Sequence, residues 1–177
     1  MDTSARIASA IDAVSRVTGN AVAWLTLAMV LATTIIVVLR YAFEFGVIWL
    51  QESLTWMHGA VFMLGAASTL QRDEHVRVDI FYRRMSERGR ALVDVAGVLV
   101  FVLPLCGWIA WESWEYVLNS WRIREVSVNA GGLPYPFTPL AKTLLIVMPA
   151  LVALQSVSLL LRSLLRWRGG PGPATGT

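Results

Sequence analysis

Two histidines and one cysteine are the side chains of this sequence that most readily bind haem or a metal. His58 lies inside an uncharged stretch, whereas His75 lies beyond its end. Haem iron held by two axial histidines needs both rings to face the iron, so this spacing disfavours a haem site within the chain. We interpret His58 as a neutral packing residue that hydrogen-bonds within a helix bundle. Cys106 is alone, which excludes an internal disulfide and favours a small core residue over a metal ligand.

Enzyme signatures are missing from the sequence. It has no glycine-rich phosphate loop, no nucleophile elbow, no HExxH motif and no paired cysteines. Charged residues make up only 15% of the 177 residues, against about a quarter in soluble domains. We therefore expect a single membrane domain that is not an enzyme and binds neither a cofactor nor nucleic acid.

Four uncharged stretches are long enough to cross a membrane: Ala21–Leu39, Ser53–Gln71, Val95–Trp111 and Thr143–Leu161. A helix rises about 1.5 Å per residue, so about 20 residues cross the roughly 30 Å hydrocarbon core. The predicted fold is an all-α membrane protein with four transmembrane helices.

The basic residues predict which way these helices face. The N-terminal arm, the loop from Arg72 to Arg90 and the C-terminal tail hold eleven of the 15. By the positive-inside rule these parts, including both termini, are cytoplasmic. The Tyr41–Ile48 turn and the Asn119–Pro139 loop then face outward.

Outside the transmembrane domain, residues 18–165, two short parts are expected. The arm, residues 1–17, carries Ile7, Ile11 and Val14 on one stripe with Asp12 off it. It is either an amphipathic helix on the inner leaflet or a frayed polar terminus. The tail, residues 166–177, is rich in glycine and proline and is expected to be disordered.

Local signals add detail to the spans. Ser86 is a good helix N-cap, from which helix could continue to about Ser120 with a kink at Pro104. The small residues from Gly65 to Ser68 predict a close approach of helices late in the second span.

Two charges lie at the outer ends of the first two spans. Arg40 ends one and Glu52 begins the next, so a tight turn would bring them to a similar depth. An Arg40–Glu52 ion pair is the favoured interpretation; snorkelling toward water and contact with another subunit are the alternatives.

A family resemblance rests on an ordered set of motifs: Leu39-Arg40-Tyr41, Trp49-Leu50-Gln51-Glu52, Gly65-Ala66-Ala67 and His75-Val76-Arg77-Val78-Asp79. From about Thr18 to Leu165 the chain resembles the DctQ-like small membrane subunit of tripartite ATP-independent periplasmic (TRAP) transporters. The family commonly has two acidic residues after the tryptophan, and here the first is Gln51.

The resemblance implies a scaffold subunit in the bacterial inner membrane. It would brace a large elevator-type membrane subunit, which holds the substrate and sodium sites, and a periplasmic binding protein would deliver an organic acid anion. Lipids are the remaining partners.

Two sets of residues are expected to matter for such a subunit. Residues expected to support the fold or the subunit contact are Arg40, Trp49, Glu52, Gly65, His75 and Asp79. By their predicted side and charge, Arg122, Arg124 and Glu125 are candidates for docking the binding protein.

Two other functions are considered. One is a redox membrane anchor in which His58 ligates haem with help from a partner chain. The other is the small subunit of a different tripartite carboxylate importer, against which the run from Gly65 to Asp79 argues.

Overall fold

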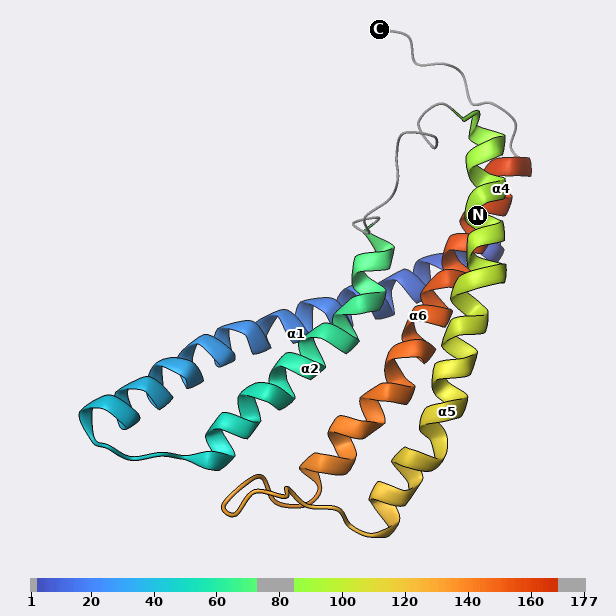
Figure 1. The fold of residues 1–177 in the computed structure, drawn as a ribbon. Helices are drawn as coiled ribbons and strands as arrows, with labels where there is room; N and C mark the ends of the chain where they lie inside the picture. The colour runs from blue at the N-terminus through green and yellow to red at the C-terminus, as the bar shows by residue number, and fades with distance from the viewer. Residues whose placement is uncertain (1–2, 73–84, 169–177) are drawn as a thin grey trace, which may run out of the picture.

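The computed structural model describes residues 3–72 and 85–168, and within these ranges the chain is entirely helical with connecting turns. The elements are α1 (Thr3–Ala42), α2 (Ile48–Gln71), α4 (Glu87–Gly97), a π-helical turn η1 (Val98–Val102), α5 (Leu103–Arg122) and α6 (Phe137–Arg168). Segments α4, η1 and α5 follow one another without interruption and form one long rod (Figure 1). The all-α prediction is confirmed.

Three of these helical segments are long and apolar enough to cross a membrane. In the described part of the chain they are Arg6–Ala42, Gly89–Arg122 and Phe137–Ser163. Helix α2 is not among them, although it is 24 residues long. The reason lies in its composition, since His58 and several hydroxyl and tryptophan side chains interrupt its apolar residues.

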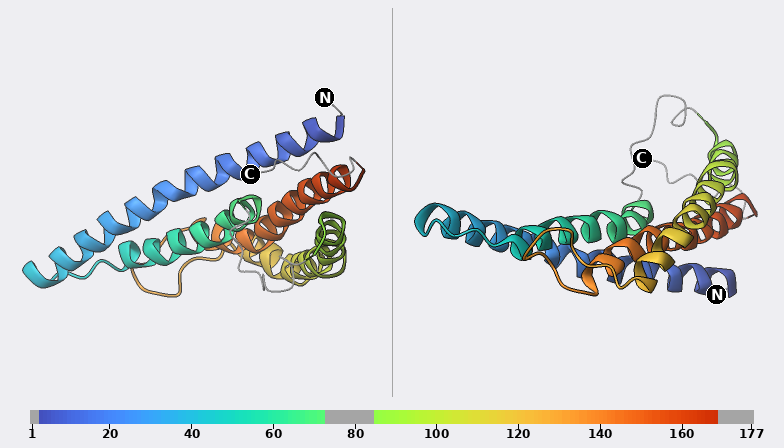
Figure 2. Two further views of the ribbon diagram at one scale, coloured as in Figure 1. Left: turned by 90° about the horizontal axis from the view of Figure 1, so that it is seen from above. Right: turned by 60° about the horizontal axis from the view of Figure 1, so that its bottom comes forward.

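Helix α6 is the element that the others share. It packs against α1, α2, α4 and α5, whereas α1 otherwise packs on α2. Figure 1 shows the α1–α2 pair on one side of α6 and the rod on the other, and Figure 2 shows the same order from two further directions. The start of α1 lies beside the late part of α6, so these two segments share one end of the molecule.

The N-terminal arm is not separated from the first span. Helix α1 continues without a break through residue 17. The predicted apolar stripe is in part turned outward: Ile7 and Val14 are 49% and 45% exposed while Ile11 is buried, so its contact with the inner leaflet stays a prediction. Asp12, expected off the stripe, is buried as well. The reason is that α6 supplies polar partners for it.

A buried hydrogen-bond network joins α1 to α6. Asp12 Oδ1 accepts hydrogen bonds from Gln155 Nε2 at 2.9 Å and Ser158 Oγ at 2.7 Å. Ser15 Oγ donates to Gln155 Oε1 at 2.7 Å, and Arg162 forms an ion pair with the second Asp12 oxygen. Each of these polar groups therefore finds its partner inside the chain, which a buried charge requires.

Close packing of α1 on α2 depends on small residues, but not on Gly65. A Cβ atom added at Gly19 would lie 2.5 Å from Ser68 Cβ, so only glycine allows this approach. Ala67 and Ser68 are buried in the same contact. A Cβ at Gly65 would meet nothing within 4 Å. The small-residue patch thus packs against α1 through its C-terminal half, and Gly65 faces away.

The rod begins at the predicted N-cap, and it is irregular next to the predicted kink. Ser86 Oγ accepts a hydrogen bond from the Gly89 backbone N–H at 3.2 Å, which confirms the N-cap. The helix ends at Arg122. The irregularity is the π-helical turn Val98–Val102, immediately before Pro104. Proline has no N–H to donate to the carbonyl four residues earlier, and that carbonyl, of Val100, lies in the turn.

The network predicts strong coupling between Asp12 and Arg162. Each of Asp12→Asn and Arg162→Gln should lower the free energy of unfolding by about 1–3 kcal/mol, because each leaves a polar group without its charged partner. The double variant should lose less than the sum, with a coupling of about 0.5–3 kcal/mol. Thermal unfolding in detergent measures this. Arg16→Gln, at an exposed position of α1, is the control, and additive losses would contradict the pairing.

Candidate functional site

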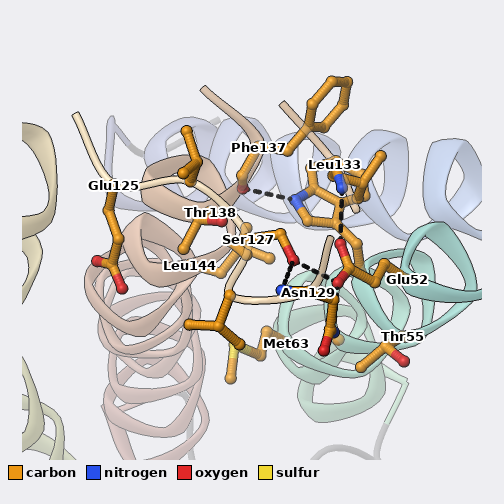
Figure 3. Close-up of a pocket in the computed structure, with 15 residues that line it drawn as sticks. Glu52, Thr55, Met63, Glu125, Ser127, Asn129, Leu133, Phe137, Thr138 and Leu144 are labelled. Atoms are coloured by element: carbon orange, nitrogen blue, oxygen red, sulfur yellow. Dashed lines mark hydrogen bonds between the residues drawn. The ribbon is translucent and has the colours of Figure 1, made fainter. Parts of the chain in front are cut away.

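A single carboxylate on α2 holds the loop that joins α5 to α6. Glu52 Oε1 accepts a hydrogen bond from Asn129 Nδ2 at 2.7 Å and another from Ser127 Oγ. Glu52 Oε2 accepts one from the Leu133 backbone N–H at 2.7 Å. Figure 3 shows these three donors converging on the Glu52 carboxylate. The contact links two parts of the chain that are far apart in sequence.

The loop is shaped to make this contact. Gly131 has a φ of 77°, and the Gly132 N–H bonds to the Asn129 carbonyl at 3.0 Å, which forms a tight turn. A Cβ atom at Gly132 would lie 2.6 Å and 2.7 Å from the two Glu52 oxygens. Glycine is therefore required where the loop backbone meets the carboxylate.

Electrostatics keep the carboxylate charged. The hydrogen bond from Ser127, followed by those from the Leu133 backbone and Asn129, lowers the pKa of Glu52 below its ordinary value. Glu52 is therefore ionised at neutral pH and carries a negative charge at this end of α2.

A second attachment fixes the other side of the loop. Lys142 Nζ on α6 donates to Glu125 Oε2 at 2.6 Å and lies 4.0 Å from the centre of the Tyr116 ring. The hydrogen bond from Lys142 is the main cause that lowers the pKa of Glu125. Trp121 Nε1 also donates to Thr143 Oγ1 at 3.0 Å. The loop is thus attached to both α2 and α6.

Beneath the loop lies a cavity of about 590 Å³ between α2 and α6 (Figure 3). Its walls are mostly apolar, and its polar lining residues lie under the loop. The lining residues are Glu52, Thr55, Trp56, Gly59, Met63, Glu125, Val126, Ser127, Val128, Asn129, Leu133, Phe137, Thr138, Ala141 and Leu144.

The predicted ion pair between Arg40 and Glu52 is wrong. Both Glu52 oxygens are occupied by the loop, and Arg40 is exposed at the end of α1. The physical reason is that three donors on one loop satisfy the carboxylate without a second charge. Trp49, one turn away, is 52% exposed and free to contact lipid headgroups or a partner.

The three residues predicted to dock the binding protein separate into two kinds. Arg122 and Arg124 are exposed at the end of α5 and the start of the loop. Glu125 is paired with Lys142, so its main contact is within the chain. The two arginines remain candidates for docking.

The other predicted residues lie on α2 or beyond it. His75 and Asp79 lie outside the described residues. His58 is exposed and makes no hydrogen bond within the described chain, so it is not a packing residue of this bundle. Gln51, Phe62 and Gly65 lie on the same face of α2 as His58, because residues three, four or seven positions apart share one face of a helix. This set, Gln51, His58, Phe62 and Gly65, is called the outward face of α2.

The sequence did not predict most of the polar contacts described above, namely those of Glu52 with the loop and of Asp12 with α6. Ser127, Asn129 and Leu133 lie in a loop whose path the sequence does not reveal. Gln155 gave a usable signal, because a polar amide within an otherwise apolar span calls for a partner. Among the described residues, no group of three histidine, cysteine or acidic side chains is arranged to hold a metal ion.

Replacing Glu52 should release the loop. In Glu52→Gln one oxygen acceptor becomes a donor, so the Leu133 N–H or the Asn129 amide loses its partner. We expect faster hydrogen exchange at the amides of residues 127–133, measured by mass spectrometry. Glu112→Gln is the control, since Glu112 accepts a bond from Trp108 within its own helix. Unchanged exchange would contradict the anchoring role.

The same contact should depend on pH in a defined direction. Because the pKa of Glu52 is lowered in the folded protein, its contribution is fully present above the ordinary value of 4.5 and is lost as pH falls through the lowered pKa. Loop protection should therefore be constant at neutral pH.

Comparison with known proteins places the chain in a family. Residues 29–166 match the family described as "Tripartite ATP-independent periplasmic transporters, DctQ component". The chain is also 34% identical over 92 residues to the C4-dicarboxylate TRAP transporter small permease protein DctQ of Vibrio cholerae serotype O1 (strain ATCC 39315 / El Tor Inaba N16961).

The alignment with that relative covers 50% of this chain and 39% of the relative. No solved structure matches the chain. The family match extends from late in α1 to near the end of α6, and so includes α2, the rod and the loop held by Glu52. The chain therefore belongs to the DctQ family, the small permease component of TRAP transporters, which is a membrane-embedded transporter component and not an enzyme.

Proposed function

We propose that this chain is a fixed scaffold subunit in the bacterial inner membrane, part of a sodium-coupled importer of an organic acid anion. The family supports the transporter class, and the relative from Vibrio cholerae is described by its C4-dicarboxylate substrate. A large membrane subunit holds the substrate and sodium sites. A periplasmic binding protein delivers the anion.

In this proposal all four long helices cross the membrane, with both termini in the cytoplasm. The start of α1 and the end of α6 share one end of the molecule, which agrees with an even number of crossings. The contact of Glu52 with the loop brings the α1–α2 turn and the α5–α6 loop together at the other end. The arginine-rich segments predict that the first end is cytoplasmic.

The outward face of α2 is the observation that carries the scaffold role. His58 and Gln51 are exposed there, although α2 crosses the membrane in this proposal. A polar side chain that faces lipid is costly, so such residues face protein or water. Gly65 lies on the same face with open space around it, which allows a second helix to approach closely. We assign this face to the large subunit.

The polar groups inside the bundle support a structural role. Asp12, Gln155 and Ser158 bond to one another, and Glu52 is saturated by the loop. Their oxygen atoms are engaged within the chain, so they are poorly suited to bind a transported ion. The transport site is accordingly assigned to the partner.

Neither alternative function is retained. Because the chain belongs to a family of TRAP components, we no longer propose that it is a subunit of a different tripartite importer or a redox anchor. In this proposal, contact with the large subunit explains the exposed position of His58.

Blocking the outward face of α2 should prevent assembly without unfolding the chain. Gly65→Leu places its side chain in open space within this subunit, yet would collide with a closely packed partner helix. We expect the affinity for the large subunit, followed by co-purification, to fall by about five- to 150-fold, as for overpacking of about 1–3 kcal/mol.

Gly97→Leu, also open but on the rod across α6, is the matched control. Full recovery of the complex with Gly65→Leu would show that the partner binds elsewhere.

Charge reversal at the loop should slow uptake. With Arg122→Glu and Arg124→Glu together, uptake into proteoliposomes should fall by about three- to tenfold, because rim charges steer association of a partner. Raising the concentration of binding protein should restore the rate. Unchanged uptake over a range of salt concentrations would remove these arginines from the docking surface.

A further inference from the structure

The cavity between α2 and α6 is a wedge with a polar roof and apolar walls. Glu52 lies near the start of α2 and Asn129 lies in the loop, whereas Met63 and Leu144 lie further along α2 and α6, away from the loop. Figure 3 shows these side chains around the cavity. The two helices run in the same direction from the loop, and Gly59 contributes no side chain to the wall between them.

The length of the wedge matches one leaflet of a bilayer. From Glu52 to Met63 the helix advances eleven residues, or about 16 Å at about 1.5 Å per residue. Half of the roughly 30 Å hydrocarbon core is about 15 Å. The roof therefore lies at the level of the outer headgroups when the far end reaches the middle of the membrane.

We propose that this wedge binds one acyl chain of a phospholipid from the outer leaflet. The chain runs beside Gly59 toward Met63, and the glycerol region lies near the loop. This site rests on the proposed crossing of the membrane by α2, and it adds a lipid-binding function to the scaffold.

The size of the cavity suits a hydrocarbon chain. It has about 590 Å³ between α2 and α6, and a single acyl chain is no thicker than an extended leucine side chain. Such a chain therefore fits between the two helices as they stand.

The wall chemistry excludes water as the main occupant. An ordered buried water needs two to four polar partners, and the polar atoms of Glu52 under the roof are already bonded to Ser127, Asn129 and Leu133. The remaining walls, including Met63, Phe137 and Leu144, are mostly apolar. Filling them with hydrocarbon restores the contacts that an empty cavity lacks.

Filling the wedge from the protein side tests the proposal. A Cβ at Gly59 meets nothing within 4 Å, so Gly59→Leu projects into the cavity without a clash. Native mass spectrometry of the full-length chain, purified from phospholipid nanodiscs into mild detergent, counts retained phospholipid. Wild type should retain one. Gly59→Leu should lose it by at least about tenfold, since each excluded methylene costs about 0.8 kcal/mol, close to fourfold in affinity.

Gly97→Leu adds the same side chain to the rod, away from the wedge, and should retain lipid as wild type does. Wild-type protein without bound phospholipid, or equal retention by Gly59→Leu, would overturn the site.

A photocrosslink identifies the occupant in the assembled complex. A benzophenone amino acid at position 59 should add the mass of one phospholipid on illumination. Attachment to a peptide of the large subunit would overturn the proposal in favour of a protein occupant.

The crossing of α2 is measured separately. Impermeant thiol reagents are applied to Trp49→Cys and Arg72→Cys in a Cys106→Ser background. Labelling from opposite sides together with an empty wedge would reject the lipid site alone. Labelling from one side would reject the proposed topology as well.

Discussion

A buried carboxylate on the first helix, Asp12, fixes where that helix crosses the last one. Between helices in a bilayer there is little hydrophobic driving force, because lipid tails are as apolar as leucine. Association is then decided by packing and by polar groups that must find partners. Asp12 meets Gln155, Ser158 and Arg162 in one geometry, so a slip of α1 along α6 would leave a charge unpaired in a poorly hydrated place.

Glu52 acts in the same way at the opposite end of the bundle. It does not bind a cation but three donors of one loop, which attach α2 to the connection between α5 and α6. The two carboxylates attach α1 to the late part of α6, and α2 to the loop that precedes α6. Under that loop Trp56 on α2 donates a hydrogen bond to the Phe137 carbonyl at 3.2 Å, and the wedge lies beside this contact.

The distribution of polar groups distinguishes internal structure from partner contact. Groups that are bonded within the chain, such as Gln155 and Glu52, set the shape of the subunit. Groups that remain exposed along α2, such as His58, point to something outside it. The proposed scaffold role would use both kinds: internal bonds that resist bending, and an exposed face for binding the large subunit.

Composition was sufficient for the helices, since a long uncharged stretch is typical of a membrane-crossing helix; by length and composition three of the described helical segments qualify as such, and α2 does not. Caps such as Ser86 were also readable, because they act over three residues. The ordered motifs from Arg40 to Asp79 indicated the family. The sequence alone could not say that Glu52 would bond to residues 127–133, that Asp12 would be buried, or that Gly19 and not Gly65 would touch its neighbour. These contacts join residues far apart in the chain, and each depends on the rotation of one helix about its axis, which only the packing of the whole bundle decides.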